Sequence, residues 1–306
     1  MYGLLTLLNG ESVERVDTFF QILFSSLETG SVYALAALGI IIIFRTSRTT
    51  NFAQGSIGMF NAFAATFALI HFGLPSWAAA IVGMVAAFLS GVLVDLVIIR
   101  RAKKTSPVAK QIITFGVIML FLGVAPMIFG STPLNFPKFI ETGAIDIFGA
   151  SISYNALLNI TIGLIIMGIL FYFLQNTKWG LAVRVTASNE ETARLMGVPT
   201  SLVTMGAWAI AAALGTLSAL MLAPAITVNV SMMDNVQTNA LIACVLGGFQ
   251  TFYGPVIGAY IIGLGRNILM YYVSSTWGEP LLFTLILLFI VLRPNGIIGK
   301  KIIKKV

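Results

Sequence analysis

The side chains that could perform chemistry are few in this 306-residue sequence. Cys244 is the single cysteine, so an internal disulfide and a cysteine-rich metal or iron–sulfur centre are excluded. His71 is the single histidine, and no cluster of histidine and carboxylate residues shows the spacing of metal ligands. No nucleophile stands beside a base, and the G-x-x-x-x-G-K-[ST] phosphate loop is missing. The sequence therefore predicts no catalytic residue, no metal and no cofactor bound by this chain, and we expect it not to be an enzyme.

A polar stretch, N-F-A-Q-G, could instead contact a passing solute. Asn51, Gln54 and Gly55 stand at the inner end of an apolar segment. Asn and Gly at such a place can open a helix and present backbone groups to a ligand, as interrupted helices do in transporters. The alternative is an ordinary N-terminal helix cap at the membrane surface. We interpret these three residues as candidates for lining a translocation pathway.

Three glycines form a second candidate group. Gly247, Gly248 and Gly254 lie at or beside the junction of two short apolar segments. Glycine at a break lets helices approach closely, or accommodates a non-helical turn inside the protein. Packing alone is the alternative to contact with a solute. We expect this hairpin to line the same pathway.

The composition shows what kind of elements must position these residues. Hydrophobic residues make up 58% of the sequence and charged residues 9%, and the mean hydropathy is +0.96. A soluble domain carries about a quarter charged residues, so this chain could not hide its apolar surface from water. Lipid offers the backbone no hydrogen-bond partners, which favours helices whose backbone is satisfied internally. The sequence predicts an all-α protein, a polytopic bundle of transmembrane helices forming one domain over residues 1–306.

Nine segments are candidates for membrane spans, since about 20 apolar residues cross a hydrocarbon core of ~30 Å. They are 19–44, 52–72, 76–99, 111–130, 156–174, 201–224, 238–250, 254–273 and 279–293. The seventh and ninth are short, so tilted, broken or partly re-entrant helices are expected there. About eight or nine spans are predicted. Seven spans plus a re-entrant hairpin over 238–273 would leave the tail on the same side, and charge counting does not separate the two.

The distribution of basic residues sets the orientation. Cytoplasmic connections of membrane proteins are enriched in Lys and Arg. With the N-terminus outside and the C-terminus inside, 15 of the 18 basic residues fall on the inner side, namely Arg45, Arg48, Arg100, Arg101, Lys103, Lys104, Lys110, Lys178, Arg184, Arg194, Arg293, Lys300, Lys301, Lys304 and Lys305. Topology thus explains the net charge of +7, and no nucleic-acid partner is expected.

Two connections are longer than the rest. The outer loop 131–155 alternates apolar residues with proline and glycine, so we expect it to pack on the outer mouth. The inner loop 175–200 predicts a short helix that Ser188 or Asn189 caps, with acidic residues in its first turn and Gly197 at its end. An isolated helix of this length is marginal in water. It therefore docks on a partner, or it is only a linker turn.

Four ionisable residues fall within the candidate spans, where an unpaired charge costs about 2.5–3.5 kcal/mol. We expect Asp95 to reach the inner interface beside Arg100, and Glu28 to lie at the surface. His71 marks an outer turn, and Arg266 either reaches the outer interface or faces the pathway. None of the four is assigned a catalytic role.

Several motifs, taken in order, resemble one family of membrane proteins. T-G-S-V-Y-A-L-A-A-L-G begins at Thr29, and N-F-A-Q-G follows it. The inner loop contains T-K-W-G-L-A-V-R and E-E-T-A-R-L-M-G-V. The C-terminal part of the sequence contains V-L-G-G-F, Y-G-P-V-I-G and R-P-N-G-I-I-G. From about Leu27 to Gly299 the chain is similar to permeases of branched-chain amino acid ATP-binding-cassette (ABC) importers, and most similar to the shorter of the two permease subunits.

The resemblance implies a function and a set of partners. It implies a permease in the cytoplasmic membrane (the inner membrane) of a bacterium or archaeon, importing branched-chain or related apolar amino acids. The implied partners are a second permease subunit in a heterodimer, two cytoplasmic ATPase subunits that use the ATP, an extracytoplasmic substrate-binding protein and the lipid bilayer. It also assigns the short helix of loop 175–200 as the coupling helix that contacts an ATPase, with Glu190, Glu191, Thr192, Ala193, Leu195 and Gly197.

Departures from the family leave alternatives open. The family commonly has His where Gln54 stands and an acidic residue near Ser56, and Gln250 and Pro255 alter the glycine-rich close. A related importer for urea, short amides or another small metabolite is therefore an alternative. A stand-alone, ion-coupled secondary transporter is another, although the scarcity of paired intramembrane carboxylates argues against it.

Overall fold

The computed structural model describes residues 2–102 and 105–299, and each of the nine predicted apolar segments coincides with a helix over most of its length. Six helices in this described part are long and apolar enough to cross a membrane, and α11 is a shorter apolar helix. Lys103, Lys104 and the lysines of the tail 300–306, predicted for the inner side, lie outside the described residues. The helices are α1 (Tyr2–Ser47), α2 (Gln54–Phe72), α3 (Ser76–Leu93) with its π-helical continuation η1 (Val94–Ile99), α4 (Pro107–Phe129), α5 (Tyr154–Asn176), α8 (Thr200–Ile226), α9 (Asp234–Gly247), α10 (Tyr253–Tyr272) and α11 (Gly278–Leu292).

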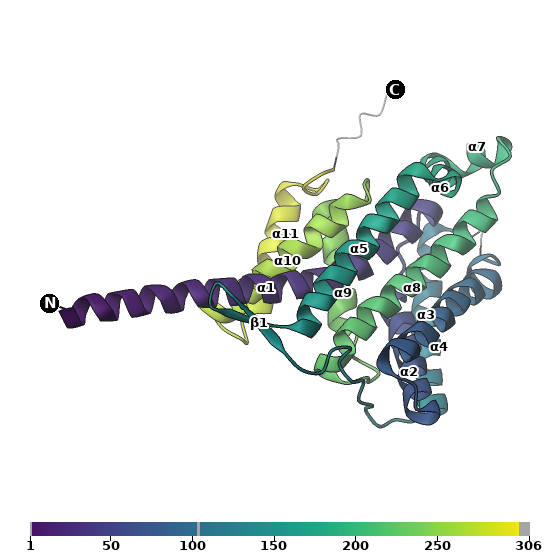
Figure 1. Ribbon diagram of the computed structural model, residues 1–306. Coiled ribbons are helices and arrows are strands. Elements are labelled where there is room, and N and C mark those ends of the chain that lie inside the picture. Colours follow the sequence, from purple (N-terminus) through teal and green to yellow (C-terminus); the bar gives the residue numbers. More distant parts are fainter. Residues whose placement is uncertain (1, 103–104, 300–306) are drawn as a thin grey trace.

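The second half of α1 forms the centre of the bundle (Figure 1). Every residue from 30 to 43 is buried, because α5, α8, α9 and α10 pack around it. A helix that is apolar all round needs such cover on every side. Small residues let the surrounding helices approach closely. At Gly58 of α2, an added Cβ would stand only 2.6 Å from the carbonyl oxygen of Gly215 in α8, so these two helices meet backbone to backbone.

Helices α3, α4 and α11 give the bundle an apolar outer surface. Ile112, Met119, Leu288 and Val291 are each more than half exposed. Soluble monomers rarely expose continuous apolar surface of this kind, whereas hydrocarbon covers it in a bilayer. The structure therefore supports a multi-pass membrane protein.

The two ends of the bundle differ (Figure 1). One end carries α6 (Lys178–Ser188) and α7 (Glu190–Leu195), together with residues 293–299. These last residues pack on the last turn of α9, where Ile297 N–H donates to the Leu246 carbonyl at 2.8 Å. The opposite end carries a hairpin of β1 (Ala144–Ile147) and β2 (Ala150–Ser153), which packs on α1 and α5.

The β-hairpin is an element that no pattern in the sequence predicts. Loop 131–155 does pack on the end of the bundle, and Leu134 pairs with Val228 after α8. The turn between the strands has positive φ at both Phe148 (52°) and Gly149 (79°). Two left-handed residues are what a tight two-residue hairpin turn requires. Phe rarely adopts a left-handed conformation, so Phe148-Gly149 does not show the residue types by which such a turn is usually predicted.

One expectation about an ionisable residue is wrong. Asp95 does not reach the inner interface, since its side chain is only 1% exposed. It lies in η1, where the Arg100 N–H donates to the Asp95 carbonyl five residues back, at 2.7 Å. This wider π-helical turn places Arg100 Nη2 3.6 Å from Asp95 Oδ2, so the carboxylate is buried beneath its ion-pair partner.

Candidate functional site

The short helix predicted in the inner loop is present as α7, and Asn189 caps it. Asn189 Oδ1 accepts the backbone N–H groups two and three residues further on, each at 3.0 Å. Glu190 and Arg194 form an ion pair one turn apart, at 3.1 Å. Gly197 has a φ of 82° and lies in the turn that follows the helix. A side-chain cap and a left-handed glycine thus define both ends of α7, as the sequence predicts.

One side of α7 faces the bundle and the other carries open apolar side chains. Ala193 is fully buried against the bundle, whereas Glu191 and Thr192 are exposed. Leu195 is 86% exposed and Met196 is 72% exposed. Large apolar side chains exposed beside charged ones are typical of a surface that docks on another protein.

The N-F-A-Q-G stretch lies inside the bundle rather than at its surface. Asn51 and Gln54 are fully buried. Gln54 Nε2 donates to the Ala211 carbonyl of α8 at 2.6 Å, and Asn51 Nδ2 donates to Gln54 Oε1 at 3.3 Å. Gln54 packs on Gly39 of α1, which lies eight residues, or ~12 Å, before the end of that helix. The non-helical segment 48–53 therefore re-enters the bundle, and α2 begins there without a side-chain cap.

A side chain of α9 satisfies the first turn of α2. Gly55 N–H donates to Gln237 Oε1 at 2.6 Å, in place of the intrahelical partner that a first turn lacks. A cavity of about 260 Å³ opens beside this contact; it is lined by residues of α2, α4 and α9 that include Gly55, Met59, Leu122, Asp234 and Gln237. Gly55 thus faces a cavity, and the buried amides of Asn51 and Gln54 support the turn behind it.

The three glycine candidates join α9 to α10 at the α7 end of the bundle. Gly247 and Gly254 touch through their backbones, since a Cβ on Gly247 would stand 1.9 Å from the Gly254 carbonyl oxygen. Gly248 has a φ of 92°, and a Cβ there would stand 2.9 Å from the Asn295 carbonyl oxygen. Close packing and turn geometry account for these glycines. Their place in a translocation pathway stays a prediction.

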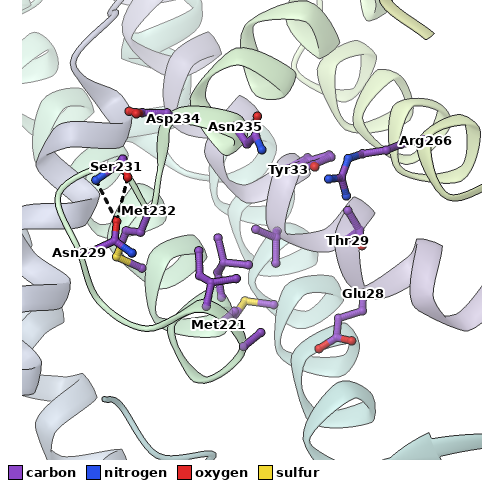
Figure 2. Close-up of a pocket in the computed structure, with 14 residues that line it drawn as sticks. Glu28, Thr29, Tyr33, Met221, Asn229, Ser231, Met232, Asp234, Asn235 and Arg266 are labelled. Carbon is purple, nitrogen blue, oxygen red and sulfur yellow. Dashed lines mark hydrogen bonds between the residues drawn. The ribbon is translucent and has the colours of Figure 1, made fainter. Parts of the chain in front are cut away.

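A larger cavity, of about 590 Å³, lies between α1, α8, α9 and α10 (Figure 2). Three charged side chains, Glu28, Asp234 and Arg266, line it together with aliphatic and methionine side chains. In Figure 2, Glu28 and Arg266 lie on one side of the cavity, and Asp234 and Ser231 lie on the other. The cavity therefore combines opposite charges with apolar surface.

Glu28 is held in place by α5. Asn159 Nδ2 donates to Glu28 Oε1 at 2.8 Å, and also lies 3.3 Å from the Met221 carbonyl. Glu28 stands 19 residues before Ser47, which is ~28 Å along the helix axis and nearly the thickness of a hydrocarbon core. The apolar span of α1 runs from Asp17 to Ser47, so Glu28 lies within that span. Its side chain is partly buried and hydrogen-bonded, and its expected surface location stays a prediction.

Arg266 lies at the same level on α10. Its neighbour Asn267 donates through Nδ2 to Ser26 Oγ of α1 at 3.2 Å, which fixes the register of the two helices. Arg266 Nε lies 3.6 Å from Glu279 Oε1, which is too long for a hydrogen bond. Both atoms are buried and have no hydrogen-bond partner. The two side chains therefore form an ion pair without a hydrogen bond between these atoms.

No pattern in the sequence predicts that Glu28, Asp234 and Arg266 line one cavity. They are far apart along the chain and meet only through the packing of α1, α9 and α10. The sequence does offer one signal for this cavity, because Glu28 and Arg266 are charged residues within apolar segments. Charged residues inside membrane spans are rare and usually belong to a functional site. Among the residues that the structure describes, no three His, Cys, Asp or Glu side chains gather as metal ligands.

Comparison with known proteins agrees with the arrangement of the helices. Residues 22–292 match the family described as "branched-chain amino acid transport system / permease component". LivH of Escherichia coli K12, a permease protein of a high-affinity branched-chain amino acid transport system, is 25% identical and covers 96% of this chain and 99% of its own length. BraD of Pseudomonas aeruginosa, another such permease protein, is 24% identical over 94% of this chain and 98% of its own.

Two further proteins are also similar to this chain, one from a system with a different substrate and one with a much lower sequence identity. LsrC of Yersinia pseudotuberculosis, the permease protein of an autoinducer 2 import system, is 26% identical over 88% of this chain and 75% of its own length. A solved ABC transporter in an inward-facing conformation has a TM-score of 0.52 and 16% identity, over 95% of this chain and 98% of that one. At this identity the likeness concerns the fold alone. The family match, by contrast, runs from α1 to α11.

Proposed function

The chain belongs to the family of permease components of branched-chain amino acid transport systems, and we propose that it is the translocating subunit of an ATP-driven importer for branched-chain or related apolar amino acids. The family match over residues 22–292 is the observation that carries this proposal. LivH and BraD, which align along more than nine tenths of the chain, support the same substrate class.

We propose that the chain crosses the cytoplasmic membrane nine times, with the β-hairpin outside and α7 inside. The end that carries α7 also carries Arg45 and Arg48, as cytoplasmic ends do. The 14 residues of α9 extend only ~21 Å, and the non-helical segment 227–233 supplies the rest of that crossing. The turn between α9 and α10 contacts residues 293–299 at the α7 end, which favours two full crossings over a re-entrant hairpin.

We propose that α7 is the coupling helix. Its defined cap and the exposed Leu195 and Met196 suit a helix that docks in a groove of another protein. The sequence contains no phosphate loop, so an ATPase would be a separate polypeptide. The implied assembly contains two ATPase subunits, a second permease subunit and an extracytoplasmic binding protein.

Alternating access is the mechanism that this assembly would use. ATP binding and hydrolysis move the ATPase subunits, and α7 moves with them. Arg48 donates to the Ser188 carbonyl at 3.3 Å, and α7 also contacts α8, so displacement of α7 reaches α1 and α8 beside the cavity. Such a switch requires that ATP and substrate bind the outward and inward states with different affinities.

A related importer for another small metabolite is the second candidate, because LsrC belongs to a system that imports autoinducer 2. Uptake by cells that lack their own leucine importers separates the candidates. Cells that express the complete importer should accumulate labelled L-leucine, and omission of this chain should abolish it. Uptake of urea or autoinducer 2 without uptake of leucine would contradict the substrate assignment.

A further inference from the structure

The 590 Å³ cavity between α1, α8, α9 and α10 has the charges that an amino-acid head group requires. We propose that it binds the zwitterionic head group during translocation, with Arg266 taking the carboxylate and Glu28 taking the ammonium. This inference rests on the proposed function, since it names the site at which the permease receives its substrate.

Glu28 and Arg266 are positioned to hold two ends of one small molecule. The contact between Asn267 and Ser26 sets Arg266 opposite the turn of α1 that contains Glu28. Both side chains line the cavity from the same side (Figure 2). The ammonium and the carboxylate of an amino acid are attached to the same carbon, so a cation and an anion at one level suit the pair.

The guanidinium of Arg266 has unused hydrogen-bonding capacity. It carries five N–H donors in a planar fork that matches a carboxylate. Its Nε atom is directed to Glu279 but is too far away to form a hydrogen bond, and is buried without a partner. A buried donor without an acceptor is costly. Because Glu279 does not line the cavity, a carboxylate bound in the cavity would take the two Nη groups of the fork, while Nε stays directed to Glu279.

The Glu28 carboxylate is held in position to bind the ammonium group. Asn159 holds its Oε1 atom at 2.8 Å, which fixes the carboxylate and makes Asn159 a positioning residue. Asp234 lines both this cavity and the 260 Å³ cavity beside Gly55. A second carboxylate therefore lies across the cavity from Glu28, where the two cavities adjoin.

The remaining lining is uncharged, with six apolar residues and five polar ones, namely Thr29, Tyr33, Asn229, Ser231 and Asn235. Val32, Met221, Leu222, Ala225, Ile226 and Met232 are the apolar members. Aliphatic surface with a few placed polar groups is the usual composition of a small-molecule site. The cavity thus selects a zwitterion that carries an apolar side chain.

Thiol labelling can measure occupancy of the cavity directly. Cys244 is the single native cysteine and is fully buried, so a Ser231→Cys variant carries one accessible thiol in the cavity. In right-side-out vesicles that contain the complete importer without ATP, a membrane-impermeant maleimide should label this thiol. L-leucine at ten times its dissociation constant should slow the labelling about tenfold. A Ser151→Cys variant on the hairpin is the control, and leucine should not change its labelling.

Substrate analogues assign each end of the ligand. Arg266→Gln and Glu28→Gln should each raise the leucine concentration needed for protection about tenfold or more, since each removes a charged hydrogen-bond partner. Leucinamide lacks the carboxylate and 4-methylpentanoate lacks the ammonium, so both should protect the parent protein poorly. Arg266→Gln should no longer distinguish leucine from leucinamide, and Glu28→Gln should no longer distinguish leucine from 4-methylpentanoate. A residue that only supports the fold would not produce these paired losses.

Three results would overturn the inference. Full protection by leucine in both variants would show that neither charge binds the head group. Leucine uptake by the parent importer without protection of Ser231→Cys would place the substrate elsewhere, while leaving the proposed function intact. Failure of the assembled importer to take up leucine would overturn the proposed function and this inference with it. If Arg266→Gln does not reach the membrane, Arg266→Lys and Glu28→Gln carry the test, and Arg266→Lys should retain protection.

Discussion

Replacement of Asn189 by alanine should loosen α7. Asn189 Oδ1 is the acceptor for two backbone N–H groups of the first turn, and loss of such a cap costs about 1 kcal/mol. The exposed Glu190–Arg194 pair contributes only about 0.3–0.5 kcal/mol and cannot compensate. A penalty of about 1 kcal/mol raises the population of open α7 about fivefold.

Hydrogen exchange of the segment 190–198 in the purified permease measures this change. Amides bonded within α7 should exchange about fivefold faster in Asn189→Ala, because exchange follows local opening. Asn189→Ser keeps an oxygen acceptor at the cap and should exchange like the parent protein. The apparent affinity for the ATPase subunits should fall by no more than the same factor, since only folded α7 docks. Unchanged exchange in Asn189→Ala, or equal acceleration in Asn189→Ser, would refute the role of the cap.

Two further predictions concern the packing of α2. Gly58→Ala should destabilise the protein by about 1–3 kcal/mol in thermal unfolding, because its Cβ would meet the Gly215 carbonyl. Gly116→Ala, which has open space around it, should be neutral or stabilising by up to about 1 kcal/mol, and equal losses would contradict the packing. Gln237→Leu should destabilise by about 1–3 kcal/mol, because the Gly55 N–H loses its acceptor. Thr238→Val, whose hydroxyl bonds only within α9, should stay within about 0.5 kcal/mol; a matching effect in both would argue against the α2–α9 contact.

The helices could be predicted from the sequence because hydrocarbon demands long apolar runs. The largest difference between predicted and observed bounds is at α1, which begins at Tyr2 instead of residue 19. A second difference arises where polar residues line a cavity. Helix α9 begins at Asp234, whereas its apolar run begins at Thr238, because Asp234 and Gln237 face cavities instead of lipid. Hydropathy cannot distinguish a polar residue at a membrane surface from one that lines an internal space.

The candidate sites were predictable to different degrees for the same reason. Helix α7 is signalled by residues a few positions apart, from the cap at Asn189 to the left-handed Gly197. The cavity depends on Glu28 and Arg266, which come together only because α10 packs closely on α1. A site such as α7 can be predicted from residues close together in the sequence. The cavity cannot, because it is formed by the tertiary packing of helices through small residues.

Transport by reconstituted components tests most directly whether a separate ATPase drives this permease. Proteoliposomes should contain the chain with its partner permease, with or without the ATPase subunits, and should receive leucine-loaded binding protein on the outside. We predict that leucine accumulates only when the ATPase subunits are present with ATP on their side. Accumulation by the permease subunits alone, driven by an ion gradient, would contradict the account.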